Sequence, residues 1–541
     1  MAGKGLKFRA SHRARSADGA SSFHSAGGYV KRHRSQPRNE TPLGTRRLVP
    51  MTPPEFTEAA DLTETPAGPP PYVTTLGQLK ASGWQPSTVA AEIRRNAAAR
   101  IAAGQPLVRG VLGFEDTVLP QLENAVLAGH DIILLGERGQ AKTRLIRSLV
   151  SLLDEWLPIV AHSEINDDPF APVSRYAKDL VAEQGDETPI SWVPRRDRYG
   201  EKLATPDTSI ADLIGEVDPI RVAEGRYLSD ELTIHYGLVP RLNRGIFAVN
   251  ELPDLAERIQ VGLLNVLEER DVQIRGHRVR LPLDIMLVAT ANPEDYTNRG
   301  RIITPLKDRF GAQIRTHYPP DAATELAIAR MESYVPGDIT ASGGGVTRVE
   351  MPDFMAEVVA ELSQLARQSP HLNQRSGVSV RLTIANYETL TANATRRALR
   401  AGESEAVPRV SDLQSLVSST QGKVEIETLE EGREELLMSQ LVSAAVLTVF
   451  RRRVRFDDPQ GVVAAFSEDT VVHAGDDLPS SAYAETLTRM PVLSGPVLAL
   501  AGSEDPAVVA SALEFVLEGL HLTKRLNKEA AGPRATYRGR G

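Results

Sequence analysis

The 541-residue sequence contains no cysteine. This absence excludes disulfide bonds, thiolate zinc sites, iron–sulfur clusters and cysteine nucleophiles, and it agrees with a cytoplasmic location. No apolar run approaches the roughly 18 residues needed to cross a bilayer, so we predict no membrane span. Aromatic residues make up only 5% of the chain, whereas hydrophobic residues make up 41% and charged residues 24%. These proportions indicate a globular protein with room for two to four domains.

Basic residues are concentrated at the start of the chain. The net charge is −8, yet the first fifty residues hold eleven Lys and Arg against only Asp18 and Glu40. The rest of the chain is therefore acidic, and nucleic acid is an unlikely partner for it as a whole. Residues 1–75 are rich in Arg, Ser, Gly and Pro, which predicts a disordered basic tail. A tether to nucleic acid or to a membrane surface is the alternative interpretation of this tail.

The stretch Asp131–Thr143 predicts a phosphate-binding loop. The apolar run Ile132–Leu135 is typical of a buried strand, and apolar residues at helical spacing follow Thr143. In such a strand–turn–helix, backbone N–H groups face the phosphates, the lysine reaches the β- and γ-phosphates, and the hydroxyl holds Mg²⁺. One position departs from the usual pattern, because alanine replaces glycine before the lysine. The predicted ATP-binding residues are Gly136, Glu137, Arg138, Gly139, Gln140, Ala141, Lys142 and Thr143.

A second motif, Gly245–Leu255, predicts a strand that carries polar residues to the same nucleotide. The buried strand ends at Asn250 and Glu251, and Glu251 is suited to orienting or deprotonating the attacking water. An aspartate normally stands at the position of Asn250. Asparagine offers an oxygen without a charge, and hard cations prefer carboxylates, so we expect a lowered metal affinity. Thr143 and Asn250 are the predicted Mg²⁺ ligands.

Two further segments complete the predicted core. An apolar strand over residues 285–290 leads to Asn292, where a polar side chain can reach the γ-phosphate or its water. Alternating residues on both sides of Gly276 and His277 predict a β-hairpin. Residues 163–200 are polar and without a clear pattern, and they open a long insertion ahead of Gly245.

Together these motifs resemble the MoxR and magnesium-chelatase subunit I branch of AAA+ ATPases, over residues 107–381. In this branch alanine before the Lys-Thr pair is usual, and a helical insert precedes the Walker B strand. The resemblance implies that Val111, Leu112 and Phe114 contact the adenine. It also implies a homo-oligomeric ring, usually hexameric, with ATP and Mg²⁺ between subunits and a von Willebrand factor A domain protein as partner.

The resemblance also assigns residues beyond the two motifs. Asn292 takes the place of sensor 1. Arg309, in Asp308-Arg-Phe-Gly311, takes the place of the arginine finger that reaches the neighbouring subunit, with Arg299 and Arg301 as rivals. Arg381 takes the place of sensor 2 in the helical lid, with Arg375 as its rival. The predicted catalytic set is Glu251, Asn292, Arg309 and Arg381.

The predicted fold class is α/β, with a P-loop core of parallel sheet and helices that carries the hairpin and the helical insert. A helical lid and a C-terminal helical region follow it. The expected domains are a disordered tail (1–75), a nucleotide-binding core (76–320), a lid (321–456) and a C-terminal helical region with a basic tail (457–541).

The predicted function is that of an ATP-hydrolysing ring motor that remodels an unknown client with its partner. Three alternatives remain open. The first is the ATPase subunit of magnesium chelatase, which inserts metal into a porphyrin. The second is a nucleotide-gated scaffold without hydrolysis, because two motif positions are substituted. The third is a DNA-acting machine, for which Arg275, His277, Arg278 and Arg280 of the hairpin are the candidate contacts.

Overall fold

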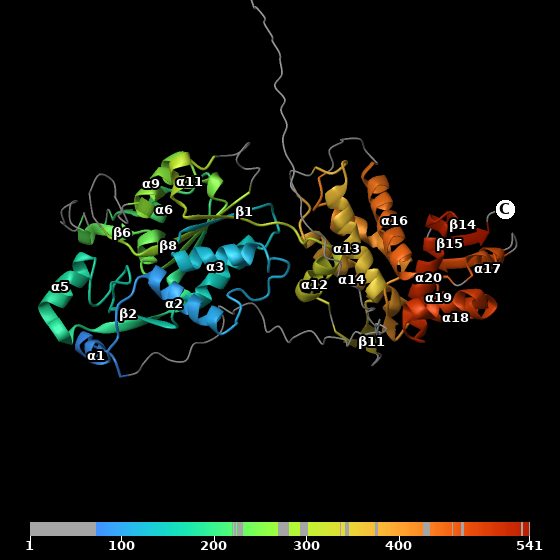
Figure 1. Ribbon diagram of the computed structural model, residues 1–541, viewed down its shortest axis with the longest axis horizontal. Helices are drawn as coiled ribbons and strands as arrows, with labels where there is room; N and C mark the ends of the chain where they lie inside the picture. Colours follow the sequence, from blue (N-terminus) through green and yellow to red (C-terminus); the bar gives the residue numbers. More distant parts are fainter. Residues whose placement is uncertain are drawn as a thin grey trace, which may run out of the picture. The chain divides into compact units, whose positions relative to one another are not determined.

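The computed structural model describes residues 72–539, except 219, 221–222, 224–230, 269–280, 293–300, 336, 341–345, 374–376, 426–432, 457, 467–469 and 532–533. The described residues belong to one compact unit. Within the described part, a sheet-containing half is followed along the chain by a mainly helical half (Figure 1). The predicted hairpin, Arg299, Arg375 and almost all of the predicted tail lie outside the described residues.

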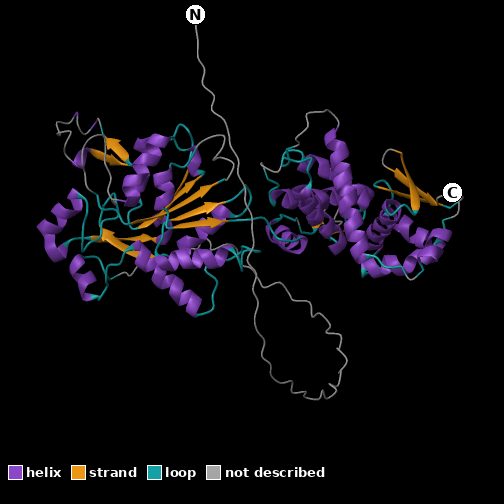
Figure 2. Cartoon of the chain, turned by 45° about the horizontal axis from the view of Figure 1, so that its top comes forward, coloured by secondary structure: helices purple, strands orange, loops and turns teal. Residues whose placement is uncertain are grey.

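The first half is built on a five-stranded parallel sheet (Figure 2). Its central strands are apolar because both faces are covered, as is usual for parallel sheets. Ile133 and Leu135 pack on one face, whereas Ile132 and Leu134 pack on the other. In spatial order the strands are β4 (Tyr199–Leu203), β7 (Gly245–Asn250), β8 (Ile285–Ala291), β1 (Ile132–Leu135) and β9 (Ala312–Arg315).

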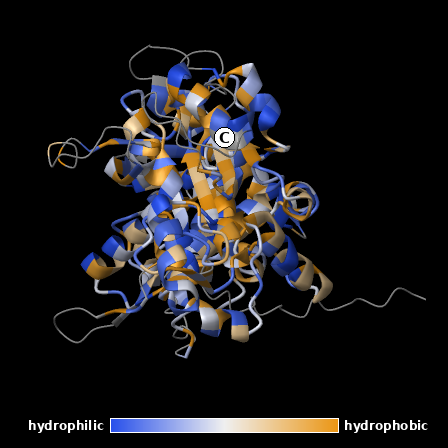
Figure 3. Ribbon diagram, turned by 90° about the vertical axis from the view of Figure 1, so that its left-hand side faces the viewer, coloured by the Kyte–Doolittle hydropathy of each residue, from blue (hydrophilic) through white to orange (hydrophobic). Residues whose placement is uncertain are grey.

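Helices cover both faces of this sheet, and Figure 3 shows hydrophobic residues gathered on the strands in the middle of the view. One face packs against α2 (Val89–Ala102), α3 (Val118–Ala128) and α4 (Lys142–Ser148). The other packs against α9 (Glu257–Glu268) and α11 (Thr304–Arg309). The other α-helices among the described residues of this half are α1 (Leu76–Ala81), α5 (Arg175–Gln184), α6 (Ile210–Leu213) and α8 (Leu238–Arg241). This arrangement confirms the predicted α/β class.

The long insertion differs from the prediction. Residues 163–200 were expected to be irregular, yet they include α5, β3 and the start of β4. The insertion thus contains strands as well as helices. Its β3 (Ile190–Pro194) pairs with β2 (Trp156–Val160), which precedes the insertion, and its β5 (Gly215–Val217) pairs with β6 (Ile234–Tyr236). β4 has no apolar run because it is an edge strand with no buried residue, and its ladder with β7 stabilises it.

Buried charges anchor the start of β4. Arg198, which is fully buried, donates to both carboxylate oxygens of Glu92 at 2.7 Å and to the Arg244 carbonyl at 2.8 Å. Glu92, on α2, also accepts a hydrogen bond from the Asp154 backbone N–H at 2.6 Å. The pair therefore connects α2, the loop before β2 and the edge of the central sheet.

The second half is a helical assembly around one continuous core that runs from Leu326 to Tyr537. The predicted lid and C-terminal region share this core, so the boundary at 456 stays a prediction. Its longest helices are α13 (Asp353–Gln368), α14 (Arg381–Ala401), α16 (Arg433–Arg453) and α20 (Pro506–Leu522). Shorter ones are α12 (Ala322–Glu332), α15 (Leu416–Thr420), α17 (Pro459–Ala464), α18 (Ser480–Arg489) and α19 (Ser494–Ala501).

Two small sheets were not predicted in this half. One contains β10 (Ile339–Thr340), β11 (Val346–Val349) and β12 (Glu405–Ala406). The other joins β13 (Val471–Gly475) to β14 (Leu526–Ala531) and β15 (Arg534–Gly539), so residues expected to form a basic tail are strands (Figure 2). Tyr537 is buried and donates to Glu518 of α20 at 2.5 Å, which fixes this sheet on the helices. None of the described helices has the length and apolar character to cross a membrane.

Candidate nucleotide site

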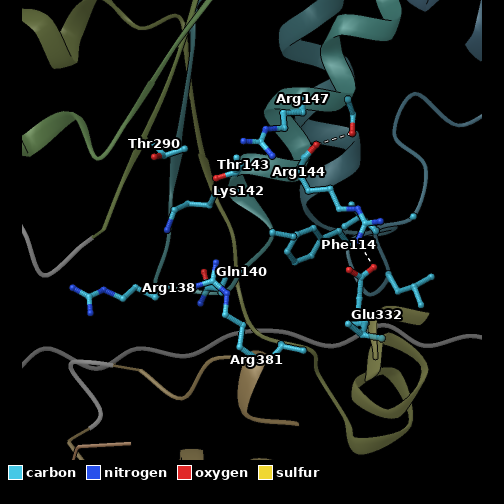
Figure 4. Close-up of a pocket in the computed structure, with 18 of the residues that line it drawn as sticks. Phe114, Arg138, Gln140, Lys142, Thr143, Arg144, Arg147, Thr290, Glu332 and Arg381 are labelled. Atoms are coloured by element: carbon cyan, nitrogen blue, oxygen red, sulfur yellow. Dashed lines mark hydrogen bonds and ion pairs between the residues drawn. The ribbon is translucent and has the colours of Figure 1, made fainter. Parts of the chain in front are cut away.

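A cavity of about 850 Å³ lies where the parallel strands end at their carboxyl edge (Figure 4). Ligands of open α/β sheets bind at this edge, because loops from several strands meet there. The cavity volume is within the usual range for small-molecule sites, roughly 300–1,000 Å³. Large apolar residues line it together with the phosphate-binding loop, among them Val111, Leu112, Phe114, Ile328, Met331 and Ile384. The three residues predicted to contact adenine are among them.

The predicted phosphate-binding loop connects β1 to α4. Lys142 is buried, and its ammonium donates to the Gly136 carbonyl, to the Glu137 carbonyl at 2.8 Å and to Asn292 Oδ1 at 2.7 Å. Asn292 directly follows β8, the strand beside β1. The fold therefore brings together two predicted site residues that lie 150 positions apart in the sequence.

Ala141 has φ 53° and ψ 16°, which is the left-handed region. This conformation explains why glycine is usual at that position, since a Cβ is disfavoured there by roughly 1–2 kcal/mol. Gly139, with φ 76°, lies so close to Ser379 that a side chain would collide with it. The loop thus uses one glycine for close approach and tolerates alanine at the second left-handed position.

We expect Ala141→Gly to change the free energy of unfolding by less than about 1 kcal/mol. Glycine removes the strain of a left-handed alanine in the folded state. This gain is offset because glycine has greater conformational freedom in the unfolded chain. Ala141→Val is the contrasting variant, and it should destabilise by more than about 1–2 kcal/mol because a β-branched residue fits this region poorly. Denaturant unfolding of both variants measures the difference. Equal effects would contradict the conformational explanation.

Asn250 and Glu251 lie at the end of β7, and both line the cavity. Glu251 has φ 55° and ψ 50°, and its backbone N–H donates to Thr290 Oγ1 at 3.0 Å. Asn250 donates through Nδ2 to Glu201 Oε1 at 2.5 Å, and its Oδ1 accepts from Thr290 Oγ1 at 3.4 Å. A non-glycine residue in the left-handed region is uncommon and is concentrated at functional sites. The strand thus ends in a fixed turn that presents both side chains to the cavity.

The oxygen atoms that line the cavity are suited to binding Mg²⁺ together with a nucleotide. Among the described residues, no three His, Cys, Asp or Glu side chains gather to bind a metal alone. The hydroxyl of Thr143, the amide oxygen of Asn250 and the carboxylate of Glu201 nevertheless line the same cavity. Mg²⁺ prefers oxygen ligands and usually takes only one or two carboxylates together with substrate phosphates.

Comparison with known proteins agrees with this geometry. The profile of the Sigma-54 interaction domain matches residues 224–309. Magnesium-chelatase subunit ChlI of Nostoc sp. is 27% identical over 236 residues, which is 41% of this chain and 57% of that protein. The ChlI subunit of Mesostigma viride is 29% identical over 238 residues, 41% of this chain and 59% of that protein. The chain therefore spans a little over half the length of these curated relatives.

The chain carries an AAA+ core similar to that of magnesium-chelatase subunit I. Among solved structures, one that describes the complex between subunits BchI and BchD of magnesium chelatase is 20% identical, with a TM-score of 0.30. It covers 61% of this chain and 98% of that chain. Sequence, sheet order and cavity position together support the AAA+ assignment.

Two arginines predicted to act on the nucleotide occupy different places in this AAA+ protein. Arg381 begins α14 and lines the cavity, where Figure 4 shows it beside Gln140 of the loop. Arg309 ends α11 and does not line the cavity, and it forms an ion pair with Glu268 of α9. Its role as a finger for a neighbouring subunit stays a prediction. The rival Arg301 is exposed, and its carbonyl accepts from Gln260 at 3.0 Å.

Sequence reasoning missed much of the cavity wall, including three charged residues. Glu201 enters from β4, and an ion pair between Arg144 and Glu332 joins α4 to α12 across the cavity (Figure 4). Arg144 directly follows the Lys-Thr pair, so the sequence could have predicted that it lies near the nucleotide. Nothing in the sequence near Glu201 or Glu332 signals a site, because each reaches the cavity only through packing of distant elements.

Proposed function

We propose that this AAA+ protein binds ATP with Mg²⁺ and hydrolyses it as a ring-forming motor that remodels a partner protein. The observation that carries the proposal is that Lys142 and Glu251 line one cavity at the carboxyl edge of the sheet, with Asn292 hydrogen-bonded to Lys142. These groups match the tasks of phosphoryl transfer. A cation holds the phosphates, a polar side chain senses the γ-phosphate, and a carboxylate orients the water.

Each residue of the chain has a distinct task in this proposal. Lys142 exchanges its contact with Asn292 for one with the phosphates, which leaves Asn292 available to the γ-phosphate or its water. Glu251 accepts a hydrogen bond from the attacking water, and bound Mg²⁺ neutralises charge on the phosphates. Arg381 reaches the nucleotide from the lid, so loss of the γ-phosphate releases α14 and moves the helical half. Arg309 of one subunit serves the site of the next.

The test is hydrolysis of ATP by the purified chain beside Lys142→Ala. We expect the variant to hydrolyse ATP about 10²–10³-fold more slowly, because it lacks a preorganised donor to the transferring phosphoryl group. Lys178→Ala, at an exposed position of α5, is the matched control and should behave as wild type. Sizing with and without ATP measures ring formation. Equal hydrolysis by wild type and Lys142→Ala would disprove this use of the cavity.

A second candidate is the ATPase subunit of a magnesium chelatase, and the names of the curated relatives favour it. Both candidates use the same nucleotide site, so they differ only in the partner and in what the motor acts on. Our proposal retains a von Willebrand factor A domain protein as the partner. Pull-down from cells of the source, followed by a metal-insertion assay with porphyrin and the captured proteins, separates them. Insertion of Mg²⁺ would select the chelatase.

A further inference from the structure

Glu201 and Asn250 are neighbours on one face of the sheet. β4 pairs with β7 in a register that sets Glu201 opposite Ala248, two residues before Asn250. Residues two apart on a strand share a face, so both side chains point the same way. The amide Nδ2 of Asn250 donates to Glu201 Oε1 at 2.5 Å, and both residues line the cavity together with Thr143. A carboxylate therefore stands directly beside the uncharged residue of the Walker B strand.

Glu201 is held as a carboxylate. Its two oxygens accept hydrogen bonds from Arg147, Tyr199 and Asn250. Arg147 donates at 2.9 and 3.2 Å, and Tyr199 donates at 2.9 Å. The carboxylate is thus oriented by three donors. An ionised carboxylate is the ligand type that Mg²⁺ prefers and that Asn250 lacks.

The other acidic residues on the cavity wall are less suited to this task. They are Glu251 and Glu332. Glu251 stands at the position that serves the attacking water. Glu332 comes from the lid and is paired with Arg144 of α4. Glu201 is the one that touches Asn250.

We propose that Glu201 supplies the carboxylate of the Mg²⁺ site, with Asn250 orienting it, so that the charge usually carried by the Walker B strand comes from the adjacent strand. This inference rests on the proposed binding of Mg²⁺ and ATP. It changes the expectation of lowered metal affinity drawn from Asn250 alone. It also explains why an acidic residue stands at this position of the edge strand.

A purely structural role for Glu201 is the competing explanation. Its ion pair with Arg147 connects β4 to α4, but the Arg147 side chain is 54% exposed. Exposed pairs of this kind contribute little to stability, because water screens them and both side chains lose freedom. The two explanations differ in a measurable way. A structural role depends on Arg147, whereas a metal role depends on the negative charge of Glu201.

The experiment measures binding of a fluorescent ATP analogue (mant-ATP) to the full chain, once with excess Mg²⁺ and once with EDTA. A Mn²⁺ titration followed by electron paramagnetic resonance reports the metal directly. For Glu201→Gln we expect the affinity for the metal–nucleotide complex to fall on the order of 10–100-fold. The affinity in EDTA should stay as in wild type, which also shows that the variant is folded. Arg147→Gln keeps the carboxylate and removes only one of its donors, so the ratio between the two conditions should fall much less than in Glu201→Gln.

The double variant Glu201→Gln/Asn250→Asp returns the charge to the Walker B strand and should restore the metal response. The proposal is overturned if Glu201→Gln keeps the full response, if Arg147→Gln loses as much, or if the double variant stays as weak as the single one. Wild type that binds mant-ATP in neither condition would instead overturn the proposed nucleotide function itself. A wild type that binds equally in both conditions would contradict only the metal site.

Discussion

Glu251→Gln should lower the turnover of ATP by about 10²–10⁴-fold while leaving ATP binding within a few-fold of wild type, the range typical for loss of a general base. The substitution keeps the shape and removes the charge that orients the attacking water. Glu251 lines the cavity from the end of β7, and its backbone is fixed by the hydrogen bond to Thr290 Oγ1 at 3.0 Å. The amide of glutamine fits the same space, so the nucleotide pocket should persist.

Two measurements on the same sample separate chemistry from binding for this variant. Single-turnover hydrolysis gives the rate of the chemical step, and mant-ATP titration gives the affinity. Glu257→Gln, at an exposed position in the first turn of α9, is the control and should hydrolyse as wild type. If wild type binds ATP and forms rings but hydrolyses no faster than Glu251→Gln, the motor hypothesis fails for the isolated chain. A nucleotide-gated scaffold or a partner-activated ATPase would then explain the site.

The second large effect concerns stability. We expect Glu92→Gln to lower the free energy of unfolding of the AAA+ core by about 3–5 kcal/mol, because it leaves the Arg198 guanidinium buried without a countercharge. Side-chain exposure is 0% for Arg198 and 3% for Glu92, so water cannot replace the lost partner. Arg198 is also three residues before Glu201. Loosening this anchor should therefore disturb the edge strand as well.

The chain carries its own reporter and control for this measurement. All three tryptophans, Trp84, Trp156 and Trp192, lie in the sheet-containing half, so fluorescence during denaturation follows that half. Arg95→Gln removes an exposed pair with Asp154 from the same helix, and its loss should cost less than about 1 kcal/mol. Replacing Glu92 and Arg198 together by methionine should recover much of the loss, as for other buried pairs. Equal effects of Glu92→Gln and Arg95→Gln would contradict the buried-pair argument.

The sequence by itself determined the parts of the site that are local. The phosphate-binding loop is one contiguous strand–turn–helix, so the run Ile132–Leu135, the glycine turn and Lys142 are enough to predict its geometry. Strands β7 and β8 are buried on both faces and therefore mainly apolar, so the sequence predicted both strands and the polar residues at their ends. Glu251 and Asn292 were found for this reason.

Only the tertiary structure decided what lies beside these motifs. Glu201 is on an edge strand whose polar sequence, Tyr-Gly-Glu-Lys-Leu, has no apolar run, because that strand is held by its neighbour and not by its own burial. It stands 49 residues before Asn250, and their contact depends on strand order and register, which no local pattern encodes. The strands β13–β15 escaped prediction for the same reason. Local motifs could be predicted from the sequence, whereas the pairing of distant segments was evident only from the tertiary structure.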